Sequence, residues 1–263
     1  MPASIKYGLR RRKVVTTPVQ GSNGSAHGTT LERMDIGQKK GWSGFSDVDR
    51  SSDALSLVRY LDKANSNEVV RFSKWQLIHR ILCPQKGDSI LDVGCGPGHD
   101  IHILATLVGK NGRIVGVDKS EIVIREAIKR CHGLTIPVGF QVGDIHQLDF
   151  PDDSFDRCLV ASTLMYVDTP LKAIREIVRV LKPGGRLAVL EGDRDTLVMS
   201  IGNTVVTDRV IGLIRQSLRN SGIGHELPIL FRQAGLKQID VEAVALAISD
   251  YRLASDAWRS RPP

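Results

Sequence analysis

Three glycines at alternate positions, Gly94, Gly96 and Gly98, follow a short apolar run in the stretch SILDVGCGPGHD. Asp92 stands two residues before the first of them. Glycine lets a main chain come close to a ligand because it has no Cβ atom in the way. A loop of this kind can hold a dinucleotide, a phosphate or another adenosyl ligand, and the neighbouring residues decide between these chemistries.

The spacing of this glycine loop argues against the first two ligands. Dinucleotide-binding loops follow the pattern G-x-G-x-x-G. Here the pattern is G-x-G-x-G, and His99 stands at the place of the third fingerprint glycine. The carboxylate of Asp92 would also repel a nearby pyrophosphate. A phosphate-binding P-loop needs Gly-Lys-Ser/Thr at its end, and this sequence does not follow the loop.

S-adenosylmethionine suits these residues better, because it has no phosphate and carries an ammonium, a carboxylate and a sulfonium group. Asp92 can bind the ammonium directly or through water, and the helix N-terminus after Gly98 can bind the carboxylate. Asp118, at the end of the next apolar run, is placed to accept hydrogen bonds from both ribose hydroxyls. Asp144 can accept one from the adenine amino group, with Ile145 against the ring.

Apolar runs alternate with helical patterns in the part of the chain that holds these residues. We predict strands over residues 88–94, 112–118, 137–144, 155–162 and 186–192, and helices over residues 98–108, 120–129 and 170–181. Such an alternation indicates a parallel sheet covered by helices on both faces. Ligands of these sheets lie outside the carboxyl ends of the strands. Four polar residues fall at those ends: Asp92, Asp118, Asp144 and Ser162.

Further elements are expected on either side of this alternation. From about residue 52 the chain reads as two amphipathic helices with a break near residues 65–67, and the sequence PQKG at residues 84–87 ends them. The sequence KPGG at residues 182–185 is expected to stop the last helix of the alternation before its fifth strand begins.

Four motifs stand in register along the chain: LDVGCGPG, GRIVGVDKS, VGDIHQLDFPDDSFD and EIVRVLKPGGRL. Together they resemble the class I S-adenosylmethionine-dependent methyltransferases, and more narrowly the small-molecule branch that includes ubiquinone/menaquinone-type methyltransferases. The resemblance covers about residues 45–245. It implies a Rossmann-like, doubly wound, mostly parallel sheet with helices on both faces, and an N-terminal helical lid over the site. It also implies cofactor contacts at Asp92, Gly94, Gly96, Asp118, Lys119, Asp144, Ile145 and the backbone near Ser162.

The side of the site that would face the methyl acceptor is less clear. Many relatives in this family place a histidine where this chain has Tyr166. A phenol can orient an acceptor or contact a sulfonium by cation–π attraction, and plain packing is an equal alternative. His225, in GIGHELP, is a second candidate wall of the acceptor pocket. His99 and His102 share one helix face without a visible third ligand, so we predict no metal site.

The end of the chain departs from the family pattern. The resemblance implies a sixth strand over Gln238–Ile248 and a seventh, antiparallel strand beside it. After Ile248 only SDYRLASDAWRSRPP follows, which has no strand pattern, so we expect the seventh strand to be missing. Without the seventh strand, the backbone groups of its neighbour in the sheet would be exposed, which would weaken the sheet. A non-catalytic or degenerate S-adenosylmethionine-binding protein on the same fold is therefore an alternative.

Charge and composition limit the classes of partner and the cellular locations that the chain can have. The net charge is +7, but residues 1–40 hold eight of the 36 Lys and Arg residues and only two acidic ones, so the rest of the chain is almost neutral. This distribution argues against a nucleic-acid partner and makes an RNA methyltransferase the weaker alternative. Four cysteines without a CxxC pair favour a reduced, cytoplasmic protein. An organelle transit peptide in the basic N-terminal tail is the other option, and no apolar run is long enough to span a membrane.

These observations give one reading of the whole chain. We expect a basic, disordered tail over residues 1–44, a helical lid over 45–85, a methyltransferase core over 86–248 and a C-terminal tail over 249–263. The expected activity is in-line transfer of the methyl group of S-adenosylmethionine to a small-molecule acceptor.

Overall fold

The computed structural model describes residue 49, residues 54–200 and residues 202–245. The predicted tails over residues 1–44 and 249–263 lie outside these residues. In the described part of the chain, none of the helices is long and apolar enough to cross a membrane.

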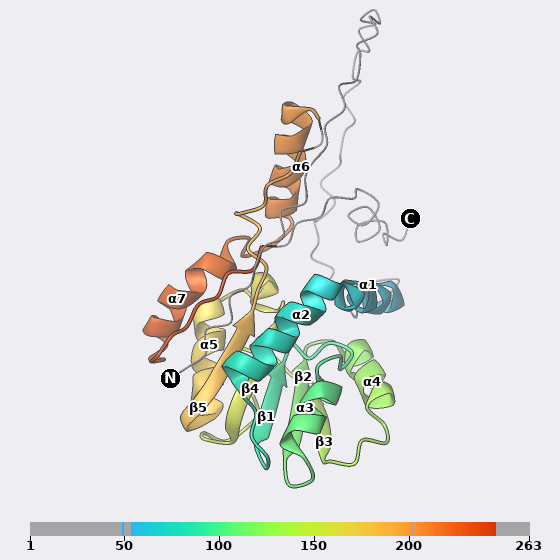
Figure 1. Cartoon of the computed structure of the whole chain (residues 1–263), viewed down its shortest axis with the longest axis vertical. Coiled ribbons are helices and arrows are strands. Elements are labelled where there is room, and N and C mark those ends of the chain that lie inside the picture. Colours follow the sequence, from blue (N-terminus) through green and yellow to red (C-terminus); the bar gives the residue numbers. More distant parts are fainter. Residues whose placement is uncertain (1–48, 50–53, 201, 246–263) are drawn as a thin grey trace, which may run out of the picture. The chain divides into compact units, whose positions relative to one another are not determined.

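Five parallel strands form one sheet in the order β3-β2-β1-β4-β5 (Figure 1). They are β1 (Ser89–Val93), β2 (Arg113–Asp118), β3 (Val138–Val142), β4 (Phe155–Ala161) and β5 (Leu181–Leu190). The predicted strands therefore exist in the predicted sequence order, and the α/β fold class is confirmed. The strand order reverses at β1 and β4, which pair although they are not consecutive in the chain. Ligands of open α/β sheets bind at such a switch point.

Helices cover the faces of the sheet, and others lie over the carboxyl ends of its strands (Figure 1). The core helices are α3 (Ile101–Val108), α4 (Glu121–Arg130), α5 (Pro170–Val180) and α7 (Ile223–Gln233). Before the sheet come α1 (Ala54–Ser66), α2 (Glu68–Gln76) and a π-helical turn, η3 (Leu77–Leu82). A short 3-10 turn, η4 (Leu164–Tyr166), follows β4, and α6 (Thr204–Gln216) lies beyond the carboxyl ends of the strands.

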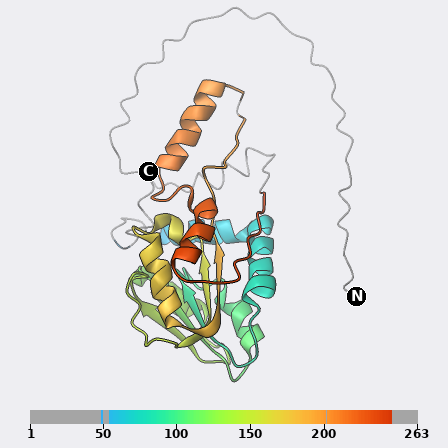
Figure 2. The same cartoon turned by 90° about the vertical axis from the view of Figure 1, so that its left-hand side faces the viewer.

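The central strands β1 and β4 send alternate side chains into two separate hydrophobic clusters, as the period of two requires. In β1, Ile90 packs with η3 and α3 on one face, whereas Leu91 packs with α5 and α7 on the other. In β4, Leu159 and Val160 divide in the same way. Figure 2 shows α5 on one side of the sheet and α2 and α3 on the other. The apolar runs of β1 and β4 are thus buried on both faces, whereas the edge strand β3 is only partly buried.

Local signals in the sequence set the helix boundaries. Ser120 caps α4 by accepting a hydrogen bond from the amide of Val123, and Glu121 and Arg130 place charges that suit the two ends of the helix dipole. Asn67 accepts hydrogen bonds from the amides of Val69 and Val70, which separates α1 from α2 at the predicted break.

The structure corrects two predicted boundaries. Helix α3 begins at Ile101 rather than at residue 98, because Gly98 has a φ of +84° and cannot continue a helix. The KPGG sequence does not separate α5 from β5: the strand begins at Leu181, and its pairing with β4 shifts register between Phe155 and Arg157. Gly184, with a φ of +79°, allows the irregular backbone there.

The predicted sixth strand does not form over the described residues 238–245. Gln238 adopts a φ of +54°, which turns the chain at the predicted strand's first residue. Val241 and Val244 stay 65% and 53% exposed, so the segment gains no buried face, which strand formation requires. Glu242 instead pairs with Arg80 of η3 at 3.0 Å. The expectation that the seventh strand is missing concerns residues after 245, which lie outside the described part of the chain.

Candidate active site

The site lies at the carboxyl ends of β1, β2, β4 and β5, where the strand order reverses. Asp92 is in β1, Asp118 ends β2, Ser162 follows β4 and Glu191 follows β5. The register pairs Asp92 with Gly116 on one side and Leu159 on the other. The predicted grouping of strand-end residues is therefore what the topology produces, and Glu191 joins them.

The glycine loop turns sharply away from β1. The amides of Gly94 and Cys95 both donate to the carbonyl of Val117 in β2, at 2.7 and 3.1 Å. Gly94 has a φ of +72°, and a Cβ atom on it would stand 2.1 Å from Oγ1 of Thr163. A Cβ atom on Gly96 would meet Cδ1 of Leu61, in α1, at 3.8 Å. Helix α1 thus covers a loop whose first glycine is required by packing.

Asp118 connects this loop with β2. Its Oδ2 accepts a hydrogen bond from the amide of Gly96 at 3.0 Å, and its Oδ1 accepts one from the amide of Ser120 at 3.0 Å. Burial raises the pKa of Asp118, and these backbone donors act in the opposite direction. Each carboxylate oxygen has a second lone pair, so the residue can still accept from the two ribose hydroxyls for which it was predicted.

Asp92 is buried, and its Oδ2 has no hydrogen-bond partner among the described residues. Burial and the charge of nearby Asp100 raise its pKa well above the usual range, while Lys74 lowers it. The ammonium of Lys74 is bound instead to Oδ2 of Asp100 at 2.7 Å. A buried carboxylate without a partner is costly, so this position fits a cationic ligand group such as an ammonium.

The N-terminus of α3 differs from the carboxylate-binding site that the sequence predicts there. Asp100 occupies the N-cap position without a side-chain capping bond. Its carboxylate, paired with Lys74 of α2, lies at the helix end where a ligand carboxylate was predicted. A ligand carboxylate there would face an acidic residue together with that residue's cationic partner.

The predicted adenine-side residues lie beyond β3. The Oδ1 atom of Asp144 accepts a hydrogen bond from the amide of His146 at 2.8 Å and lies 2.6 Å from Nδ1 of the same residue. Asp144 is exposed, and Ile145 packs against the core cluster that contains Leu91. Lys119 is exposed next to Asp118. An exposed acid beside a half-buried isoleucine is compatible with the edge and face of an adenine ring.

Ser162 joins the ends of two strands. Its backbone has a φ of +55°, and its amide donates to the carbonyl of Leu190, the last residue of β5, at 2.7 Å. The chain then turns through Thr163 into η4, which carries Tyr166.

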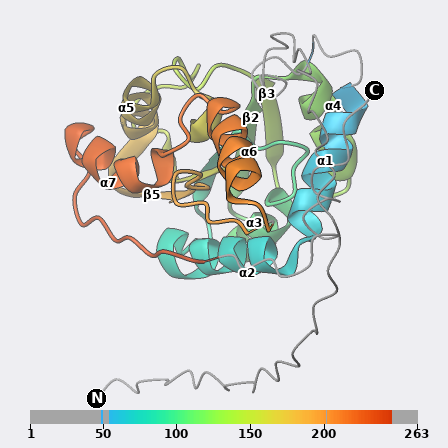
Figure 3. The same ribbon diagram turned by 90° about the horizontal axis from the view of Figure 1, so that it is seen from above.

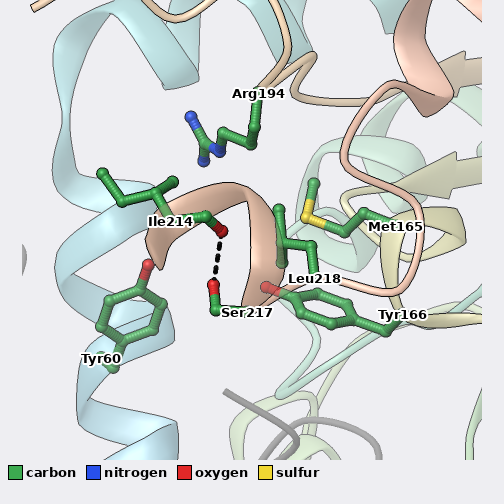
Figure 4. Close-up of a pocket in the computed structure, with 7 residues that line it drawn as sticks. All are labelled: Tyr60, Met165, Tyr166, Arg194, Ile214, Ser217 and Leu218. Atoms are coloured by element: carbon green, nitrogen blue, oxygen red, sulfur yellow. Dashed lines mark hydrogen bonds between the residues drawn. The ribbon is translucent and has the colours of Figure 1, made fainter. Parts of the chain in front are cut away.

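A pocket opens beside η4 between α1 and the end of α6 (Figure 4). Its lining joins two phenols, one guanidinium, one serine and three apolar side chains: Tyr60, Met165, Tyr166, Arg194, Ile214, Ser217 and Leu218. Figure 4 shows Tyr60, on α1, and Tyr166, on η4, at two opposite sides of the pocket, with Arg194 above both. Burial raises the pKa of Tyr166, so its hydroxyl stays protonated over the physiological range.

His225 is not among the residues that line this pocket. Its side chain is 57% exposed at the start of α7, and its Nδ1 lies 2.7 Å from Oδ2 of Asp193. The same carboxylate oxygen accepts a hydrogen bond from the amide of His225. The structure thus brings Tyr166, but not His225, to the pocket.

Sequence reasoning missed Glu191. Its Oε1 accepts hydrogen bonds from the amides of Thr163 and Leu164 at 2.8 and 2.7 Å. Its Oε2 is buried and has no partner among the described residues. Burial raises the pKa of Glu191 to about 7, although backbone donors and Arg194 oppose the rise. The signal was present in the sequence, because Glu191 lies at the carboxyl end of the strand predicted over residues 186–192, as the other site residues lie at the ends of theirs.

Two side-chain contacts fasten the N-terminal helices over the site. Asp62 of α1 receives a two-point contact from Arg130 of α4, at 2.5 and 3.0 Å, and its Oδ1 lies 2.8 Å from Nε2 of His99. Lys74 of α2 reaches Asp100 as described above. Figure 3 shows α1 beside α4 when the molecule is viewed from above.

Replacing Asp62 with alanine is expected to loosen α1 selectively. The ion pair is partly exposed, so its loss should cost about 1 kcal/mol, or a fivefold faster opening. Hydrogen exchange of the α1 amides measures this effect. Arg125→Ala, which removes an exposed pair within α4, should leave α1 unchanged. Arg130 lowers the pKa of Asp62, so the effect of Asp62→Ala should persist at neutral pH and shrink towards acid; equal exchange at neutral pH would contradict it.

Known proteins resemble the chain over most of the described region. An uncharacterized 37.1 kDa protein in transposon TN4556 of Streptomyces fradiae is 33% identical over 198 residues, which cover 75% of this chain and 57% of that protein. A demethylmenaquinone methyltransferase of Symbiobacterium thermophilum is 29% identical over 207 residues, covering 68% of this chain and 82% of that one.

A solved structure shares the fold. Phosphoethanolamine N-methyltransferase 2 of Haemonchus contortus, in complex with S-adenosyl-L-methionine, superimposes with a TM-score of 0.52 at 22% identity, covering 65% of this chain and 38% of that one. The family model described as "Methyltransferase domain" matches residues 84–228, which run from the end of η3 into α7 and include the glycine loop, Asp118 and Glu191. Since this match covers more than half of the chain, the chain belongs to the methyltransferase domain family.

Proposed function

We propose that this chain transfers a methyl group from S-adenosylmethionine to a small-molecule acceptor. The observation that carries the proposal is the buried Asp92, whose unpartnered Oδ2 stands beside a close-turning glycine loop with Asp118 on the adjacent strand. A fold neighbour solved with S-adenosyl-L-methionine supports the choice of cosubstrate. The name of the Symbiobacterium relative, a demethylmenaquinone methyltransferase, supports a small-molecule acceptor.

The chain's own residues divide the binding work. Asp92 would neutralise the ammonium, Asp118 would hold the ribose hydroxyls, and Gly94 and Gly96 would let the backbone approach. Lys119, Asp144, Ile145 and the backbone near Ser162 would surround the nucleoside, as the sequence predicted. When bound, S-adenosylmethionine supplies an electrophilic methyl group on a sulfonium. The helices α1 and α2, which lie within the predicted lid, would exclude water from that group.

The pocket between Tyr60 and Tyr166 is the proposed acceptor site. Its apolar side chains suit an apolar acceptor, and the two phenols and Arg194 can orient polar groups on it. Tyr166 would contact the acceptor directly. His225, exposed and paired with Asp193, would act only by holding α7 to the loop after β5.

We further infer a cytoplasmic location. All four cysteines are free thiols in the structure, and three of them are buried. Free, buried thiols are typical of reducing compartments.

Calorimetric titration tests the proposed function. S-adenosylhomocysteine, the methyl-transfer product, should bind the full-length chain, and NAD, the ligand of the alternative glycine-loop pattern, should not. The loop lacks the third fingerprint glycine, and Asp92 disfavours a pyrophosphate. Binding of NAD, or of neither ligand by a folded sample, would overturn the proposal.

A further inference from the structure

Arg194 carries the positive charge of the pocket beside η4, and its guanidinium has no hydrogen-bond or ion-pair partner among the described residues. Only its backbone is engaged: the amide donates to the carbonyl of Ser221 at 2.7 Å, and the carbonyl accepts from Nε of Arg215 at 3.4 Å. The residue is half-buried. Because a cation beside apolar side chains is costly without an anionic partner, this guanidinium is available to a ligand.

Three acidic residues near Arg194 in the same loop could pair with it, and each is engaged elsewhere. Glu191 accepts hydrogen bonds from two backbone amides with Oε1, and its Oε2 is buried without a partner. Asp193 lies 2.7 Å from Nδ1 of His225. Asp195 accepts a hydrogen bond from a serine hydroxyl at 2.7 Å. The loop therefore supplies no counter-ion in contact with the guanidinium.

The rest of the pocket surrounds this cation with apolar side chains and phenols. Figure 4 shows Arg194 on one side of the pocket and the rings of Tyr60 and Tyr166 on the other. The charge of Arg194 acts to lower the pKa of both phenols, which places the guanidinium near each of them. The apolar walls come from Met165, Ile214 and Leu218. None of the residues that line the pocket is acidic, so the pocket favours a negatively charged group.

From this arrangement we propose that the methyl acceptor is an apolar molecule with a carboxylate group, and that Arg194 binds this carboxylate. The inference rests on the proposed function. A guanidinium offers two parallel N–H donors to the two oxygens of a carboxylate. One cation balances the single charge of a carboxylate, whereas a phosphate monoester carries about −1.5 to −2 at neutral pH. The apolar walls contact the rest of the acceptor.

This role makes Arg194 a specificity-determining residue. A site built to bind a polar group rejects analogues that lack it, because its own polar atoms are then left without a partner. The alternative role is structural: the stem of Arg194 would cover apolar surface while the guanidinium stays in water. The two roles differ in one measurable property, since only the first predicts a preference for an anion over a neutral molecule of the same shape.

Benzoate and benzamide test this preference, because they share one shape and differ in charge. We expect the full-length chain, with S-adenosylhomocysteine bound, to bind benzoate at least about tenfold more tightly than benzamide, as charge-assisted hydrogen bonds imply. Arg194→Gln should lose the preference. Arg194→Lys, which keeps the charge without the planar fork, should retain part of it. Equal affinities in the wild type, or an unchanged preference in Arg194→Gln, would overturn the proposal.

Arg219→Gln is the matched control. Arg219 follows Leu218 of the pocket lining, but its guanidinium is paired with Asp168. The substitution thus removes the same charge from the neighbourhood of the pocket without touching Arg194. It should keep the wild-type preference for benzoate. A loss as large as that in Arg194→Gln would mean that the preference reflects net charge, and the assignment of Arg194 would fail.

A second readout locates the bound benzoate. A Cβ atom on Gly192 would lie 3.4 Å from Cζ of Arg194 and 3.6 Å from Cε of Met165, so the methyl group of Met165 lies near the guanidinium. In protein with ¹³C-labelled methionine methyl groups, benzoate should shift the NMR signal of Met165, which Met165→Leu identifies by its loss. If benzoate binds and this signal does not move, the anion binds elsewhere and the proposal is wrong.

The same titrations separate this proposal from the proposed function. S-adenosylhomocysteine is titrated first, and benzoate is then titrated both with and without it. If S-adenosylhomocysteine does not bind the folded chain, the proposed function fails, even if benzoate is preferred over benzamide. If it binds and the chain shows no preference for benzoate, only the carboxylate-bearing acceptor is overturned.

Discussion

Replacing Asp118 with alanine is expected to weaken the binding of S-adenosylhomocysteine by about a thousandfold. On the proposed binding mode, the variant loses two charge-assisted hydrogen bonds to ribose hydroxyls, each of which contributes about 1.5–3 kcal/mol. It also frees the amide of Gly96, which Oδ2 of Asp118 now binds at 3.0 Å. Both changes act on the cofactor side of the site, so the loss should appear in affinity. Calorimetric titration at one pH and salt concentration gives the change directly.

The control for Asp118→Ala is a carboxylate that also accepts a backbone hydrogen bond but lies away from the site. Asp156 begins β4 at the opposite end of the sheet, and its Oδ2 accepts a hydrogen bond from the amide of Ser89 at 2.9 Å. Asp156→Ala should therefore lower stability to a similar extent and leave affinity unchanged. If Asp118→Ala retains its affinity while it remains folded, Asp118 does not hold the ribose.

The sequence allowed the fold to be predicted because its signals are local. Apolar runs of strand length, the Ser120 cap and the Asn67 break each act within a few residues, and the structure confirms them. The strand predicted over Gln238–Ile248 does not form in its described part, residues 238–245, because its apolar alternation has no sheet face to bury. Alternation alone does not determine whether a neighbouring strand offers a place.

The site was only partly predictable for a related reason. The rule that ligands lie at strand ends located Asp92 and Asp118 and would equally have located Glu191. The contacts that hold α1 and α2 beside these residues join positions far apart in the chain. Asp62 pairs with Arg130, and Lys74 with Asp100. Such pairs depend on where α1 and α2 pack, and single-sequence patterns carry no information about that packing.

Gly94→Ala is expected to destabilise the fold by about 2–5 kcal/mol. An alanine pays about 1–2 kcal/mol to adopt a left-handed backbone, and Gly94 has a φ of +72°. The new Cβ atom would also stand 2.1 Å from Oγ1 and 2.6 Å from Cγ2 of Thr163, and overpacking of this kind costs about 1–3 kcal/mol. The shift of the urea unfolding midpoint, at an unchanged slope, measures the sum.

Two further variants separate these two costs. Gly87 has a φ of +90° and open space where its Cβ atom would be, so Gly87→Ala should show only the backbone cost. Thr163→Gly removes every atom of the predicted clash, so the double variant with Gly94→Ala should be more stable than the sum of the single changes predicts. Equal destabilisation in Gly94→Ala and Gly87→Ala, or strict additivity with Thr163→Gly, would mean that the loop after β1 moves away from Thr163 at little cost. The close approach of Gly94 to Thr163 would then not be a packing requirement of the fold.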